Sequence, residues 1–173
     1  MTPKGIVGLD LSLTASGIAT LAGERTIISG PTKKRFNRYD LIWTAIKGEL
    51  QEGDLVVIEG YAFGAKGQAI FQIAELGGII RYNLWKEGFP FVEVAPACLK
   101  KYVLGKGGGK GTDKKAMLLE TYKRTGMEFN QDDNQVDAFW LRQMGQLQYN
   151  IDTEIIIPMP VLNREAMSAV EWL

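Results

Sequence analysis

The chain has 173 residues, with 20 Lys and Arg, 20 Asp and Glu and no His, so its formal net charge is zero. The lack of His excludes a Ser-His-Asp triad and a His-ligated zinc site within these residues, and a single Cys, Cys98, excludes an internal disulfide framework and fits a reducing compartment. The apolar fraction of 46% is typical of a globular domain, and no apolar stretch reaches the roughly 18 residues of a membrane span.

The first sixty residues predict a group of strands, a helix and a further strand. Three short apolar runs, at 6–11, 16–22 and 24–29, have tight glycine-containing connections and predict an antiparallel meander. Apolar residues then recur with a helical period over Phe36–Leu50, and a buried strand is expected at Leu55–Glu59.

The remaining elements alternate between helix and strand. A helix over Gly67–Lys86 precedes a fifth strand at Phe89–Ala95, and its Gly77-Gly78 pair indicates close packing against another backbone. Three helices follow, at 96–104, from an N-cap at Thr112 to about 125, and at 132–147. This order predicts an α/β fold with a mixed five-stranded sheet, three antiparallel strands and then parallel ones, with helices on both faces.

We expect one domain over residues 1–150, followed by a C-terminal extension at 151–173 that packs on the domain or on a partner. The extension contains the apolar run Ile155–Pro158, which could form an edge strand, and a helix-like stretch, Asn163–Leu173.

Three acidic residues stand at the ends of apolar runs or inside them. Asp10 closes the first strand, Glu59 closes the fourth, and Asp137 lies in the last core helix between Val136 and Ala138. A carboxylate beside buried residues is costly unless something pairs with it. If the three converge, they form an oxygen-rich site for a hard divalent cation, as metal-dependent phosphodiester cleavage requires. The alternatives are an ordinary turn at Asp10 and a strand end at Glu59 that faces solvent.

Two more acidic residues precede Asp137. Asp133 lies four residues before it, so the two side chains share one face of a helix. Asp132 and Asp133 also suit a helix N-terminus because of the helix dipole, and capping is the alternative role for this pair.

The neutral net charge conceals a basic region. Between Pro96 and Gly126, eight basic residues stand against two acidic ones, a local charge of +6. Such a region can hold a polyanion, because its field acts locally at physiological salt. A solvated helix face with a flexible loop at Gly105–Gly111 is the alternative.

From about Gly5 to Leu147, the order of segments resembles the RuvC-type Holliday-junction resolvases of the RNase H-like superfamily. The resemblance rests on Gly8-Leu-Asp10 with Ser12 and Gly17, on Val57-Ile-Glu59, on Asp137-Ala138, and on the stretches 68–80 and 94–101. The chain departs from the bacterial pattern in the Leu-Ser that follows Asp10 and in Asn134, where bacterial members carry an acid or a histidine.

The resemblance implies an RNase H-like fold and a homodimer that nicks two strands of a four-way DNA junction symmetrically, with two Mg²⁺ or Mn²⁺ ions per site. Asp10, Glu59, Asp133 and Asp137 would be the catalytic and metal-binding residues, with Asp132 and Asn134 as alternatives to Asp133. The compact length is similar to phage or organelle versions, which implies a cytoplasmic protein without membrane contact, in the bacterial host cell if it is phage-encoded.

The residue types near these positions also predict roles in DNA binding. Tyr61 and Phe63 would stack on bases unpaired at the crossover, with plain core packing as the alternative. Lysines of the basic region would neutralise phosphates, and they are Lys100, Lys101, Lys106, Lys110, Lys114 and Lys115.

Two other functions remain open. One is a small nucleotide-binding domain of the actin and sugar-kinase type, whose first phosphate loop also reads Asp-x-Ser-x-Thr-x-x-Gly. Against it, 173 residues do not hold the two related halves and second phosphate loop of such proteins. The other is a catalytically silent junction-binding protein on the same fold, since a fold does not fix an activity.

Overall fold

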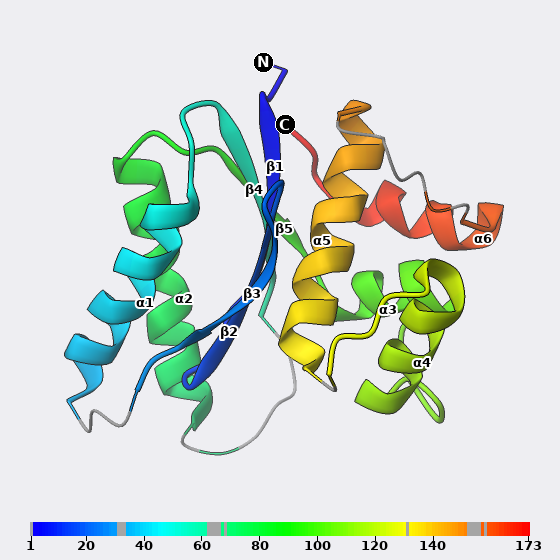
Figure 1. Cartoon of the computed structure of the whole chain (residues 1–173), viewed down its shortest axis with the longest axis horizontal. Helices are drawn as coiled ribbons and strands as arrows, with labels where there is room; N and C mark the ends of the chain where they lie inside the picture. The colour runs from blue at the N-terminus through cyan, green and yellow to red at the C-terminus, as the bar shows by residue number, and fades with distance from the viewer. Residues whose placement is uncertain are drawn as a thin grey trace.

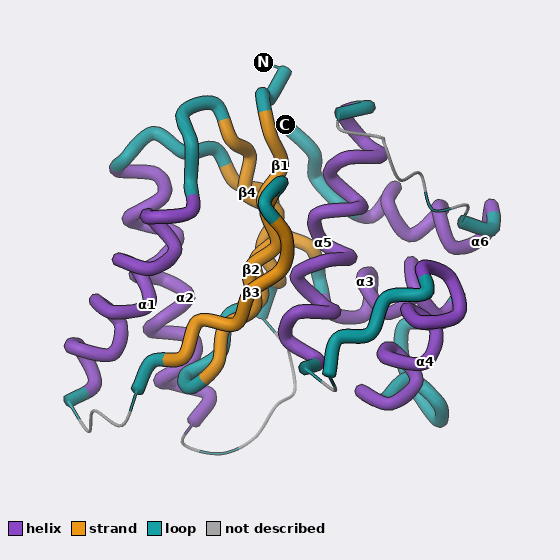
Figure 2. Tube along the Cα trace, in the orientation of Figure 1, coloured by secondary structure: helices purple, strands orange, loops and turns teal. Residues whose placement is uncertain are grey.

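The sheet is built from short apolar strands that helices cover on both faces. The computed structural model describes residues 2–30, 34–61, 67, 69–130, 132–151, 157 and 159–173. The strand order is β3-β2-β1-β4-β5, in which β1 is antiparallel to β2, β2 is antiparallel to β3, and β4 is parallel to both β1 and β5. Figure 2 shows the strands, in orange, between the helices. The predicted fold class is therefore confirmed. The strands are β1 Gly5–Asp10, β2 Ala15–Thr20, β3 Gly23–Ile28, β4 Asp54–Glu59 and β5 Phe91–Val94.

Two layers of helices enclose this sheet (Figure 1). Helices α1, Arg35–Glu49, and α2, Ala69–Lys86, cover one face, and α5, Asp133–Tyr149, lies along the other. Helices α3, Pro96–Leu104, and α4, Lys114–Thr125, pack outside α5. Among the helices of the described chain, none is long and apolar enough to cross a membrane.

The side chains of β1 and β4 divide between these two layers. Val7, Leu9, Val56 and Ile58 join the buried cluster under α1 and α2. Alternate residues such as Ile6, Leu55 and Val57 join the cluster that contains Trp140 of α5. Because strand side chains alternate with a period of two, this pattern also directs the last residue of each strand toward α5.

Two predictions about local structure were wrong. The N-cap of α4 is Asp113, whose carboxylate accepts a hydrogen bond from the backbone N–H of Ala116, whereas Thr112 donates to the carbonyl of Gly109 in the preceding turn. A Cβ on Gly77 would meet side chains, those of Tyr61 and Arg81, rather than another backbone, and a Cβ on Gly78 would meet open space.

The C-terminal segment is less helical than its sequence predicts. A short helix, α6 at Val161–Arg164, continues into the 3₁₀ helix η2 at Glu165–Ala169, and no helix follows Val170. The expected strand at 155–158 falls almost wholly outside the described residues. Met159, Met167 and Val170 are buried in the cluster that includes α3 and α5, so this segment contributes to the core.

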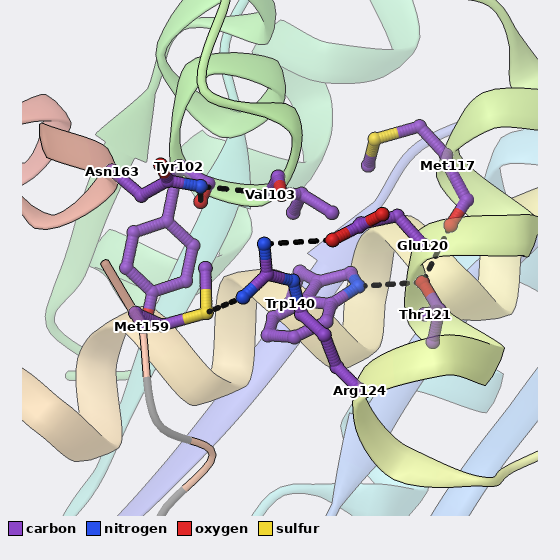
Figure 3. A network of polar contacts seen from close by, with 9 residues as sticks. All are labelled: Tyr102, Val103, Met117, Glu120, Thr121, Arg124, Trp140, Met159 and Asn163. Carbon is purple, nitrogen blue, oxygen red and sulfur yellow. Dashed lines mark hydrogen bonds and ion pairs between the residues drawn. The ribbon is translucent and has the colours of Figure 1, made fainter.

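Polar contacts join α3, α4, α5 and the C-terminal segment (Figure 3). The indole N–H of Trp140 donates to the Thr121 hydroxyl at 2.8 Å, which ties α5 to α4. The Asn163 amide donates to the carbonyls of Tyr102 and Val103 at 2.8 and 3.3 Å, and thereby satisfies two carbonyls at the end of α3.

Asn163→Ala should lower the free energy of unfolding by about 1–3 kcal/mol, because two buried carbonyls would lose their donor. Urea denaturation followed by circular dichroism measures this change. Ser168→Ala, which alters an exposed side chain of η2, serves as the control and should shift stability by less than about 0.5 kcal/mol. Equal midpoints for the two variants would show that the amide does not anchor this segment.

Candidate active site

Two carboxylates meet at the carboxyl ends of β1 and β4. The parallel register pairs Leu9 with Ile58, so the next residues, Asp10 and Glu59, lie side by side at the same edge of the sheet. Both belong to the series of alternate residues that faces α5, and the side chain of Asp10 is only 7% exposed. The predicted convergence of these two residues is therefore present in the structure.

Helix α5 brings a third carboxylate to this edge because it lies directly on the strand backbones. A Cβ on Gly8 would stand 1.9 Å from the carbonyl oxygen of Ala138, and one on Gly17 would stand 1.9 Å from that of Asn134. No real Cβ tolerates such distances, so the close contact of α5 with β1 and β2 requires glycine at both positions. Asp137, between these two contact points, is held beside Asp10.

The pKa values show how strongly these groups interact. Burial raises the pKa of Asp10 well above its usual value, and the charges of Glu59 and Asp137 raise it further. Burial also raises the pKa of Glu59, while a hydrogen bond from Asp10 and the charge of Lys100 act in the opposite direction. The hydrogen bond between the two side chains thus raises the pKa of Asp10 and lowers that of Glu59.

Asp137 is affected in the same way. Burial, followed by the charges of Glu59 and Asp133, raises the pKa of Asp137 to about 7, although Lys100 and Lys114 partly offset these effects. The carboxylates from β1, β4 and α5 therefore form one electrostatic cluster.

The two acids that precede Asp137, Asp132 and Asp133, have different roles. Asp132 is the N-cap of α5, where it accepts from the backbone N–H groups of Asn134 and Gln135 and from the Thr26 hydroxyl. Asp133 forms an ion pair with Lys114 and contributes to the raised pKa values of Asp10 and Asp137. Since Asp132 is committed to its cap, Asp133 is the fourth acid of the cluster.

The six predicted DNA-binding lysines have different surroundings in the structure. Lys100 and Lys114 lie near enough to the cluster to lower the pKa of Asp137. Lys106 donates to the carbonyl of Lys110 at 2.6 Å in the glycine-rich loop, so these two residues stabilise the loop itself. The other two, Lys101 and Lys115, are exposed on α3 and α4.

Tyr61 is fixed on the surface of α2. Its hydroxyl donates to the carbonyl of Ala74 at 3.3 Å, and the guanidinium of Arg81 lies 4.5 Å from its ring centroid. The ring remains 37% exposed, so core packing accounts for only part of its surface. Phe63, which we expected to stack on bases, lies outside the described residues.

Arg81 is a supporting residue that the sequence analysis missed. It donates to the backbone carbonyl of Glu59 at 3.1 Å and pairs with Glu93 at 2.9 Å, so it holds the ends of β4 and β5 together. The only signal in the sequence is one arginine within the apolar helix α2, which was too little to identify it.

The chemistry of these side chains suits a hard divalent cation, which would relieve the repulsion that their raised pKa values report. As the side chains stand, no three acidic or cysteine residues of the described chain are grouped closely enough to hold a metal ion. The reason is visible in their partners, because Asp10 is bonded to Glu59 and Asp133 is turned toward Lys114.

Comparison with solved structures identifies the fold. The structure of Thermus thermophilus RuvC matches with a TM-score of 0.65 and 16% identity, over 84% of this chain and 96% of that one. The fold is RNase H-like, of the RuvC type. T. thermophilus RuvC in complex with Holliday junction substrate matches with a TM-score of 0.64 and 16% identity, over 80% of this chain and 90% of that one. No protein-family model and no curated protein matches the sequence.

The raised pKa of Asp137 predicts a stability that depends on pH. Between about pH 4 and pH 7 the folded chain retains a proton that the unfolded chain has released, so stability should fall as the pH rises through this window. Asp137→Asn removes the charge, and should therefore melt at a higher temperature than wild type at pH 8 without divalent ions, but at a similar temperature at pH 4.

Thermal melts at both pH values measure this effect, with Asp40→Asn on the exposed side of α1 as the matched control. The control should follow the wild-type pH profile. If Asp137→Asn follows it as well, Asp137 is not held in a repulsive cluster.

Proposed function

We propose that this protein is a structure-selective endodeoxyribonuclease that resolves four-way DNA junctions, and other branched DNA, by metal-dependent symmetric nicking. The observation that carries the proposal is the convergence of Asp10, Glu59, Asp133 and Asp137 from three elements at one sheet edge, with raised pKa values for Asp10, Glu59 and Asp137. Buried carboxylates that repel one another destabilise a fold unless a proton or a cation compensates them. A ligand role explains why the chain retains them.

Asp10, Glu59, Asp133 and Asp137 would hold two Mg²⁺ or Mn²⁺ ions, which supply a more acidic water and charge stabilisation for the departing oxygen. The protein's own contribution is to fix these carboxylates on rigid elements, through the β1–β4 register and the glycine contacts of α5. Lys114 would release Asp133 for this role and turn toward the phosphate.

Two observations support DNA as the substrate. Lys100 and Lys114 stand beside the acid cluster, and further lysines extend from there along the glycine-rich loop and α4. Such an arrangement neutralises successive phosphates of a backbone. RuvC of T. thermophilus, which has the same fold, is known in complex with Holliday junction substrate.

Asp10→Asn, Glu59→Gln and Asp137→Asn should each reduce junction cleavage by at least about a hundredfold while junction binding is retained, because each removes a charged ligand and leaves the DNA surface intact. The assay uses a synthetic four-way junction and a linear duplex of matched sequence, each with Mg²⁺, Mn²⁺ or EDTA. Paired symmetric nicks in the junction alone, with either metal but not with EDTA, are the expected wild-type result.

Asp132 and Asp133 provide a matched pair of controls. Asp133→Asn should impair cleavage, whereas Asp132→Asn should not, since Asn is also a good N-cap. Junction binding by wild type without nicking would favour a silent junction-binding protein, and ATP binding without DNA binding would favour the nucleotide-binding alternative.

The outer face of α2 supports the proposed homodimer. Phe71, Tyr82 and Trp85 are 76%, 57% and 70% exposed, and Gly78 between them has open space above it. Phe71, Gly78 and Trp85 are seven residues apart in succession, and Tyr82 follows Gly78 by four, which is the spacing of a helix–helix seam. A second copy of α2 would cover this stripe and present two acid clusters to the two strands of a junction.

Trp85→Lys should convert the dimer to a monomer, because it places a charge within an apolar seam. Light scattering after size-exclusion chromatography gives the mass of each species. Leu162→Lys, on the exposed side of α6 and 68% exposed in wild type, is the control and should remain dimeric. A dimer in both variants would place the contact elsewhere.

A further inference from the structure

A groove of about 820 Å³ lies between α4 and the segment that leads from α4 to α5. Lys115, Leu119 and Tyr122 form its wall on α4, and Phe129 and Asn130 belong to the opposite side. Asn130 is only two residues from Asp132, the N-cap of α5, so the groove adjoins the end of α5 that carries Asp133 (Figure 1). None of these five residues has a role in the acid cluster.

The wall of the groove is apolar and accessible. Leu119 and Tyr122 are 54% and 51% exposed, although both are large apolar side chains on a helix that packs its other face into the core. Lys115, Leu119 and Tyr122 follow one another by four and three residues, so they lie on one face of α4. Phe129, on the opposite side, is buried and contacts Phe139 of α5 at 5.6 Å between ring centroids, so this side of the groove is anchored to the core.

A cation lies beside an exposed aromatic ring in the groove. Lys115 lines it together with Tyr122, and Lys114, the preceding residue, pairs with Asp133 of the acid cluster. Glu128 is the one acid among the residues described as lining the groove. An exposed aromatic ring beside a cation is the combination that binds a base and its phosphate in single-stranded nucleic acid.

We propose that this groove binds an unpaired nucleotide of the DNA strand that enters the acid cluster. The Tyr122 ring would stack on the base, Lys115 would contact the adjoining phosphate, and the side-chain amide of Asn130 would hydrogen-bond to the edge of the base. The proposal rests on the proposed junction-cleaving function and deepens it, because it assigns a binding site for a nucleotide released from pairing at the branch point.

The main test measures affinity by fluorescence anisotropy in EDTA, where no cleavage occurs. Three labelled probes are compared, a four-way junction, a linear duplex and a single-stranded oligonucleotide of the same sequence. Tyr122→Ala should weaken binding of the single strand by about tenfold and binding of the junction by a similar factor, with little change for the duplex. Tyr122→Phe keeps the ring and should bind all three probes within about twofold of wild type.

A matched pair of lysines separates the groove from the general charge of α4. Lys115→Ala should weaken binding of the single strand more than Lys123→Ala does, although both substitutions remove one charge from the same helix. Equal losses for the two variants, or unchanged binding of the single strand by Tyr122→Ala, would overturn the proposal. Thermal melts show whether each variant is folded.

Cross-linking gives a second measurement that needs no substitution. With 5-iodouracil placed at the crossover of the junction, irradiation should join the base to the peptide that contains Tyr122, as mass spectrometry would show. A cross-link confined to other peptides counts against the groove. So does a change of oligomeric state in Tyr122→Ala, because the groove would then be a contact between two copies of the chain.

These outcomes distinguish the two proposals. Junction cleavage by wild type, with no effect of Tyr122→Ala on binding of the single strand, overturns the groove alone. Failure of wild type to bind or cut the junction overturns the proposed function and the groove together.

Discussion

Mutual repulsion between buried carboxylates is the constraint around which this structure is arranged. Asp10, Glu59 and Asp137 are removed from water, and this burial raises the pKa of each; the charges of Glu59 and Asp137 also raise the free energy of ionising Asp10, and the charge of Glu59 raises that of Asp137. A hydrogen bond between Asp10 and Glu59, with Lys100 and Lys114 nearby, offsets part of this cost.

The rest of the fold keeps that repulsive site assembled. The two central strands are apolar on both faces, and their register sets Asp10 beside Glu59. Helix α5 reaches the same place because Gly8 and Gly17 allow its backbone to contact the strands directly. The charges of the other acids repel Asp137. Because Asp137 belongs to α5, the apolar packing of this buried helix around Trp140 keeps it in place.

The layer outside α5 connects this site with its surroundings. Helix α4 carries Lys114 toward the acid cluster, and its hydrogen bond between Thr121 and Trp140 fixes it against α5. The same helix presents Lys115 and Tyr122 to the groove. One rigid element therefore presents groups both to the proposed reaction centre and to the strand that would approach it. The C-terminal segment stabilises this layer, because Asn163 donates a hydrogen bond to the carbonyl of Tyr102 near the end of α3.

The sequence by itself determined the strands, the main helices and the three acids that converge, because apolar periodicity and an acid at the end of a buried run are local signals. The mixed topology was predicted from the order of the elements, because three closely spaced strands precede two that alternate with helices. Only the tertiary structure decided between Asp132 and Asp133. A helix cap and an acid cluster both use Asp, and the two roles differ only in which groups lie near its side chain. The tertiary structure also decided that Gly77 meets the side chain of Tyr61 and that Arg81 supports β4. Both contacts join residues distant in the chain, and no local pattern encodes such contacts. The choice of Asp113 over Thr112 as the cap of α4 is local and depended on the geometry of the preceding turn.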